Sequence, residues 1–204
     1  MSNNVAKNEA VTAYKLALTS AFDAREAYER ENNANENIFK TFKSLRADFA
    51  SDVVCEVMHT ANVAADFINR QERRNKRFNV YSAEKVFNVA RAAVKAEALN
   101  VYSKHVFLTA LNLTKADKSM THADAQASLC DALKCDATKE QLISRYARSI
   151  AASTADTQSS SSINALQMFD VLTETRDDMN KVAYKLNLSA TTTKRLAKAL
   201  NVAL

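Results

Sequence analysis

The stretch from Val182 to Leu196 reads Val-Ala-Tyr-Lys-Leu-Asn-Leu-Ser-Ala-Thr-Thr-Thr-Lys-Arg-Leu, and it decides how the end of the chain is expected to fold. Its pattern predicts a short helix, a tight turn and a second helix. Apolar residues at 182, 186, 188, 196 and 200 can line one seam between two crossing helices. Asn187 stands at the reversal, where a left-handed backbone favours Gly or Asn. Ser189 is predicted to cap the second helix through its hydroxyl.

The same stretch resembles the helix-turn-helix of the LacI-type repressors. The family pattern begins with Val-Ala, has Gly and then an apolar residue and Ser at the turn, and continues with Thr and Arg. The matching residues here are Val182, Ala183, Asn187, Leu188, Ser189, Thr192 and Arg195. Asn187 departs from the turn Gly, and Thr193 stands where a buried Val or Ile is usual. The resemblance implies that Ser189 and Thr192 contact phosphates, and that Ala190, Thr191 and Arg195 face base edges in the major groove. Lys194 and Lys198 on the same predicted helix are further candidates for binding nucleic acid.

A plain helical hairpin is the alternative for these residues. Leu-Asn followed by an apolar residue occurs at 99–101, 111–113, 186–188 and 200–202. Each occurrence looks like a helix C-terminus closed by a left-handed Asn, with the next apolar residue folding back on the last turn. On this interpretation the turn is the chain's ordinary way of ending a helix and has no part in reading DNA.

The composition of the chain favours helices throughout. Its 204 residues include no Gly and no Pro, although average usage would supply roughly 14 and 10 of them. Primed hairpin turns depend on Gly, and loops commonly use Pro. The composition therefore predicts an all-α fold, a multi-helix bundle with long amphipathic helices and a small C-terminal helical unit. Lack of Gly also excludes the phosphate loop, the dinucleotide turn and the nucleophile elbow.

No arrangement of residues in the sequence points to catalysis. The three histidines (59, 105 and 122) lack the spacing of a metal site, and the three cysteines (55, 130 and 135) form no CxxC pair. We therefore expect a protein that is not an enzyme and has no metal or cofactor. Because no apolar run approaches about 18 residues and no signal-peptide core opens the chain, a soluble cytoplasmic protein is expected.

Apolar periodicity divides the chain into helices and one linker. Helices are predicted at 5–31, 83–99 and 102–112, and a single long helix at 36–75 could pair two copies of the chain into a homo-oligomer. Capping boxes at Thr121/Asp124 and Thr138/Gln141 predict helices to about 134 and 152. Residues 153–162, rich in Ser and Thr, are the predicted linker. It would separate a helical body (1–152) from a helix-turn-helix-like unit (163–204).

Positive charge is concentrated in the middle of the sequence. The net charge is +5, and residues 70–118 hold 11 basic and 4 acidic side chains. The densest group is Arg70, Arg73, Arg74, Lys76 and Arg77, which is either a solvated helix end or a phosphate-binding patch. The favoured function is non-enzymatic binding of nucleic acid, DNA rather than RNA. The alternative is an all-helical virion, scaffold or adaptor component whose basic region meets an acidic protein surface.

Overall fold

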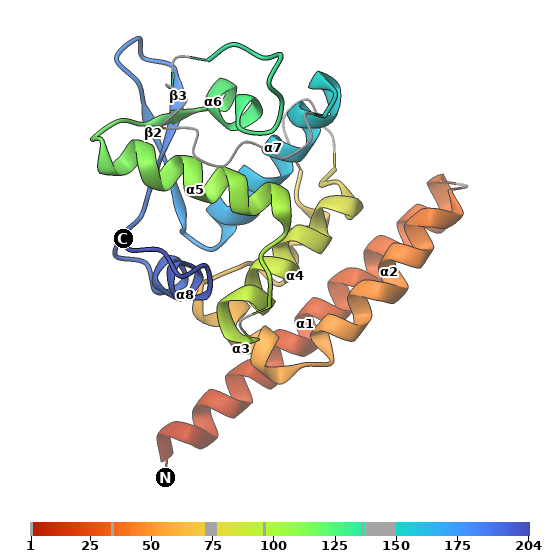
Figure 1. Ribbon diagram of the computed structural model, residues 1–204. Coiled ribbons are helices and arrows are strands. Elements are labelled where there is room, and N and C mark those ends of the chain that lie inside the picture. Colours follow the sequence, from red (N-terminus) through yellow and green to blue (C-terminus); the bar gives the residue numbers. More distant parts are fainter. Residues whose placement is uncertain (1, 34, 72–76, 96, 136, 138–149) are drawn as a thin grey trace.

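The computed structural model of the protein describes residues 2–33, 35–71, 77–95, 97–135, 137 and 150–204. Helices dominate it, as the composition predicts, but a small antiparallel sheet is also present (Figure 1). Its strands are β1 (Met120–Thr121), β2 (Leu172–Arg176) and β3 (Val182–Leu186), in the spatial order β1-β3-β2. The expectation of a purely α-helical fold is therefore correct for most of the chain and wrong for its C-terminal part.

The N-terminal part is a helical hairpin. α1 (Ser2–Asn32) confirms the first predicted helix, and α2 (Glu36–Phe49) runs back along it (Figure 1). Asn35 caps α2, since its side chain accepts the N–H of Asn37 at 3.0 Å. The predicted apolar stripe of α2 is buried. The ring centre of Phe22 on α1 lies 4.8 Å from the ring centre of Phe49 on α2. These aromatic contacts fix the hairpin to the core.

The single long helix predicted for residues 36–75 is wrong. α2 ends at Phe49, α3 covers Asp52–Thr60, and a 3-10 turn, η1, covers Phe67–Asn69. The break occurs at Ser51, whose extended backbone (φ −85°, ψ 110°) starts a new helix. The buried face shifts there by one residue, so that Val53 is 49% exposed whereas Val54 is fully buried. The break lets this segment fold back over α1 instead of extending as a rod.

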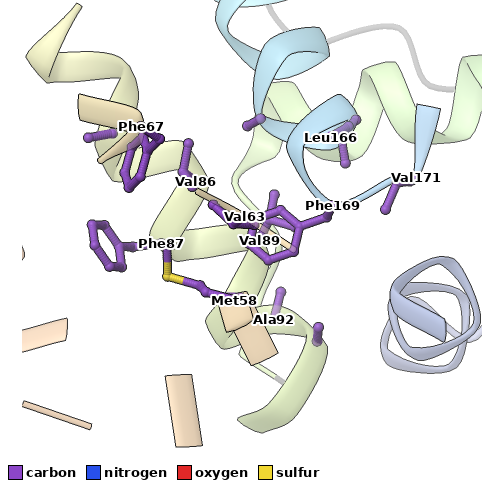
Figure 2. Close-up of a cluster of buried hydrophobic side chains, with 14 of the residues drawn as sticks. Met58, Val63, Phe67, Val86, Phe87, Val89, Ala92, Leu166, Phe169 and Val171 are labelled. Carbon is purple, nitrogen blue, oxygen red and sulfur yellow. The ribbon is translucent and has the colours of Figure 1, made fainter. Parts of the chain in front are cut away.

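Two predicted helices in the middle of the chain are confirmed with small shifts. α4 (Val80–Lys95) and α5 (Val101–Lys115) correspond to the expected helices at 83–99 and 102–112. α4 begins earlier than expected because the side chain of Asn79 accepts the N–H of Tyr81 at 3.0 Å, which caps the first turn there. α4 packs against α2 and α3 on one side and against α7 and α8 on the other. Figure 2 shows the cluster that results, with Phe87 of α4 and Phe169 from the C-terminal part in one core.

The remaining helices in the described part of the chain are α6 (His122–Ala127), α7 (Ala152–Met168) and α8 (Thr191–Ala199). The predicted capping box of Thr121 and Asp124 is confirmed at the start of α6. α6 ends at Ala127, however, well before the expected end near residue 134. The second capping box, Thr138/Gln141, lies outside the described residues.

The prediction of a linker at 153–162 is wrong, because these residues lie in α7. Ser159 and Ser162 are fully buried, and the hydroxyl of Ser103 on α5 donates to that of Ser162 at 3.2 Å. Small side chains let α7 pack closely against α4 and α5, while intrahelical carbonyls satisfy other hydroxyls on its buried side. Leu166 and Phe169 then belong to the same core as α4, so the chain is not divided at this point.

The helix-turn-helix predicted at 182–196 is not formed. Residues Val182–Leu186 are the strand β3, which pairs with β2 from Leu172↔Leu186 to Arg176↔Val182 and with β1 on its other side. Asn187 is not left-handed, and its side chain donates to Asp170 at 2.8 Å. α8 does form, but its N-cap is Ala190, because the hydroxyl of Ser189 is bonded to Asn187 at 2.7 Å.

Asparagine and aspartate take the left-handed positions that glycine fills in most proteins. All five described residues with positive φ are of these types: Asn62, Asp117, Asp170, Asn180 and Asn201. Four of them close α3, α5, α7 and α8. The N–H of Val202, for example, donates to the carbonyl of Ala197 at 3.0 Å. The predicted Asn closure is thus confirmed at Asn201. It is wrong at Asn100, which caps the start of α5, and at Asn112, which lies within α5.

Candidate nucleic-acid interface

A polar groove of about 630 Å³ lies between α7, the β2–β3 hairpin and the segment that precedes α4. Side chains from five parts of the fold line it, and most of them are polar. They are Arg70 and Gln71, His122 of α6, Ser160, Ile163, Asn164 and Gln167 of α7, Glu174 of β2, and Val182 and Tyr184 of β3. The sheet and the C-terminal half of α7 therefore form one continuous concave surface.

The helical periodicity of α7 determines which of its side chains reach the groove. Ser160, Asn164 and Gln167 follow at intervals of four and three residues, so they share one face. All three are half-buried, whereas Ile163 and Leu166 between them are buried in the core. Within the described residues, no side-chain hydrogen bond joins the amide of Asn164 or Gln167 to another group. The groove thus displays two carboxamides on a helix whose rotation is fixed by its apolar side.

His122 is attached to α7 at the end of the groove. Its Nε2 lies 3.0 Å from the hydroxyl of Ser160 and 3.2 Å from that of Ser159. A carboxylate oxygen of Asp156 lies 3.9 Å from the same nitrogen. A Ser-His-Asp relay needs the carboxylate on the other ring nitrogen. Because all three groups approach Nε2, this cluster fixes the ring against α7 and does not form a catalytic relay.

The described ends of the basic segment 70–77 border the groove at Arg70 and contact α1 at Arg77. The backbones of Gln71 and Arg77 form an isolated antiparallel β-bridge, and the N–H of Phe78 donates to the carbonyl of Arg70 at 2.9 Å. The guanidinium of Arg77 lies 3.6 Å from the ring centre of Tyr28 on α1. The two described ends of the segment are therefore held to each other, with Arg70 beside α7 and Arg77 against α1. The predicted site residues Arg73, Arg74 and Lys76 lie outside the described residues.

The β2–β3 hairpin forms the opposite wall. Its turn is stabilised by Asp177, whose carboxylate accepts the N–H groups of Met179 and Lys181 at 2.9 and 2.7 Å. Asn180 takes the left-handed position (φ 59°), which matches a three-residue hairpin loop without Gly. Arg176 and Lys181 stand at the turn, while Glu174 is the one acid among the described residues that line the groove.

The site residues predicted on α8 form a separate surface. Thr191, Lys194, Arg195 and Lys198 are exposed, as expected for a binding face, and so is Ser189. Thr192, predicted to contact a phosphate, is only 6% exposed, so that prediction is wrong. Ala190 is half-buried at the N-cap. α8 packs on α4, and Figure 1 shows it at the opposite end of the sheet from the hairpin turn. The structure therefore does not bring α8 together with the groove.

Sequence reasoning missed most of the groove: His122, Ser160, Asn164, Gln167, Glu174 and Tyr184. The confirmed capping box at Thr121 is one local signal, because it fixes the start of α6 and therefore the position of His122. The polar spacing at 160, 164 and 167 was also visible in the sequence. This spacing indicates a shared face only if residues 160–167 are helical, and the linker predicted at 153–162 conflicts with that.

Other kinds of site find no support in the described part of the chain. No group of three or more His, Cys, Asp or Glu side chains there could hold a metal ion. No helix there is both long and apolar enough to cross a membrane. Comparison with known proteins gave no matching family, no similar curated protein and no similar solved structure.

Proposed function

We propose that the protein binds duplex DNA without catalysing a reaction, and that α7 is the helix that enters the major groove. The observation that carries this proposal is the order and pairing of elements from α5 to β3. Among the described residues, a helix, a short strand, two helices and a hairpin follow one another, and the short first strand pairs with the last. This order is similar to that of a winged helix-turn-helix, in which the second helix of the pair reads DNA and the hairpin flanks it, and the similarity supports the proposal.

The connection between the two helices departs from the simplest form of that motif. Residues 128–151 separate α6 from α7, whereas the common turn has roughly three or four residues. The contacts that position α7 are nevertheless present. α6 packs against α7, and His122 is bonded to Ser160, so the pair of helices is held together without a short turn.

The distribution of charge supports DNA as the partner. Arg70 lines the groove beside α7, Arg77 lies across the bridge from Gln71 and against α1, and Arg176 and Lys181 lie next to the turn of the β2–β3 hairpin. Side chains of this kind contact phosphates and set the register of a protein on the duplex. Hydroxyl and amide groups on α7 face the space between them, where base edges would lie. Affinity would come mainly from the phosphates and would fall with salt.

The test is a salt titration of binding to a fluorescent duplex, followed by anisotropy. We expect log Kd to vary linearly with log salt, and Ser160→Ala/Asn164→Ala/Gln167→Ala to weaken binding by about tenfold or more. The control is Lys194→Ala/Arg195→Ala, which removes two of the three exposed cations of α8. If the control loses as much affinity as the α7 variant, or if the wild type does not bind, the proposal fails.

A second candidate function is a structural component that assembles through its helices, with no reading of nucleic acid. It is favoured by apolar side chains on the N-terminal helices, where Leu16 is 65% and Val53 is 49% exposed. Purified protein would then form large homo-oligomers with a low ratio of absorbance at 260 and 280 nm. Changing Leu16 to Lys would dissociate them. Monomeric protein that retains nucleic acid would exclude this candidate.

A further inference from the structure

We propose that the groove recognises adenine in A·T base pairs through the side-chain amides of Asn164 and Gln167. This inference rests on the proposed function, since it names the bases that α7 would read. Both amides line the groove, and neither has a side-chain hydrogen bond within the described residues. Binding a base therefore breaks none of the interactions that the structure describes.

The chemistry of the two side chains matches one base. In the major groove, adenine presents a donor at N6 beside an acceptor at N7, and a carboxamide can pair with both. Guanine presents two acceptors, which suit Arg or Lys. α7 has no basic residue from Ala152 to Met168, so it offers no such partner for guanine. Its reading face is thus built for A·T pairs.

The spacing of the amides also fits neighbouring base pairs. Three residues of α-helix advance by about 4.5 Å, close to the separation of about 3.4 Å between base pairs along one strand. Buried Ile163 and Leu166 fix the rotation of the helix, and the bond from His122 to Ser160 fixes the turn before Asn164. The two amides are therefore held in one orientation toward the groove.

The experiment uses the full chain and three duplex pools with identical flanks. The randomised centre contains only A·T pairs, only G·C pairs, or A·T pairs in which 7-deazaadenine replaces adenine. The analogue lacks the N7 acceptor but keeps normal base pairing. We expect the A·T pool to bind about tenfold more tightly than the G·C pool, and the analogue to abolish most of that preference. Equal binding to A·T and analogue pools overturns the inference, because the preference would then not depend on N7.

Two variants complete the test. Asn164→Ala/Gln167→Ala should bind all three pools equally while keeping the salt dependence of the wild type. Asn8→Ala/Asn37→Ala, a matched loss of two exposed amides on α1 and α2, should keep the preference. An A·T preference that survives in the first variant overturns the inference. If the wild type binds both natural pools equally with a clear salt dependence, only the inference fails. If no pool binds, the proposed function fails as well.

Discussion

Arg25 of α1 and Phe78, two residues before α4, are joined by a buried hydrogen bond in which Nη2 donates to the carbonyl oxygen at 2.8 Å. The same guanidinium donates to the carbonyl of Ile68, and its Nε donates to Glu29 at 2.7 Å. Arg25 therefore connects the two chain segments that lead into and out of the basic segment 70–77. The pair of Arg25 and Glu29 is almost fully buried.

Breaking this pair should destabilise the fold strongly. Arg25→Met leaves the carboxylate of Glu29 without its buried cation, and we expect the free energy of unfolding to fall by about 3–5 kcal/mol. The measurement is chemical denaturation. Arg30→Met is the control, because it removes a similar pair with Glu26 in which the Arg30 side chain is 60% exposed, and should cost about 1 kcal/mol or less. Equal losses in the two variants would contradict this account of Arg25.

The left-handed residue in the hairpin gives a second prediction. Asn180→Gly should maintain or raise stability, whereas Asn180→Ala should lower it by roughly 1–2 kcal/mol, because a Cβ disfavours positive φ. Denaturant titration of both variants checks this. The prediction is wrong if alanine is tolerated as well as glycine.

Lys85 should make stability depend on alkaline pH. Its ammonium donates to the carbonyl of Gln158 at 2.9 Å, and burial lowers its pKa from 10.5 to about 8. Between pH 8 and 10.5 the unfolded chain therefore binds more protons than the folded one, and the contribution of Lys85 to the free energy of unfolding rises with pH. For this one group, the free energy of unfolding can rise by up to about 1.4 kcal/mol per pH unit.

The check on Lys85 is to measure unfolding across this pH range. Relative to wild type, Lys85→Met should lose the rise, whereas Lys104→Met, which changes an exposed lysine, should keep it. A rise of the same size in Lys85→Met would show that other groups cause it.

Glu174 should oppose DNA binding, since it is an acid in a groove proposed to face phosphates and bases. We expect Glu174→Gln to tighten binding severalfold at low salt. The reason is that removing the repulsion between the carboxylate of Glu174 and a nearby phosphate is worth about 1 kcal/mol in water. The same change at exposed Glu9 on α1 is the control for net charge. If both variants bind as the wild type does, Glu174 does not face the duplex.

The parts of the fold that sequence could predict are those governed by local rules. The periodicities of α1, α4 and α5 and the capping box at Thr121 depend on neighbouring residues, and they are confirmed. The break at Ser51 was not predicted, because the apolar spacing continues across it with only a shift of one residue. The strand β3 was missed because Val182–Leu186 also fits a helical seam, and its pairing with β2 depends on tertiary structure.

The candidate site was harder to predict because its components are distant in sequence. Arg70, His122, Asn164 and Tyr184 come together only after α7 packs between α5 and α4. The sequence does not predict the helix α7, because a serine-rich run has the composition of a linker and its burial depends on tertiary packing. The absence of Gly disfavours hairpins, yet Asn180 supplies the left-handed residue that this turn requires.

The central claim is that DNA lies against α7 and not against α8. The most direct measurement places a photoreactive amino acid at Asn164, at Lys198 or, as a negative control, at Asn8, and compares crosslinking of each full-length protein to the same duplex. This account predicts crosslinks from position 164 and none from position 8, with few or none from position 198. Crosslinks from position 198 without any from position 164 would contradict it.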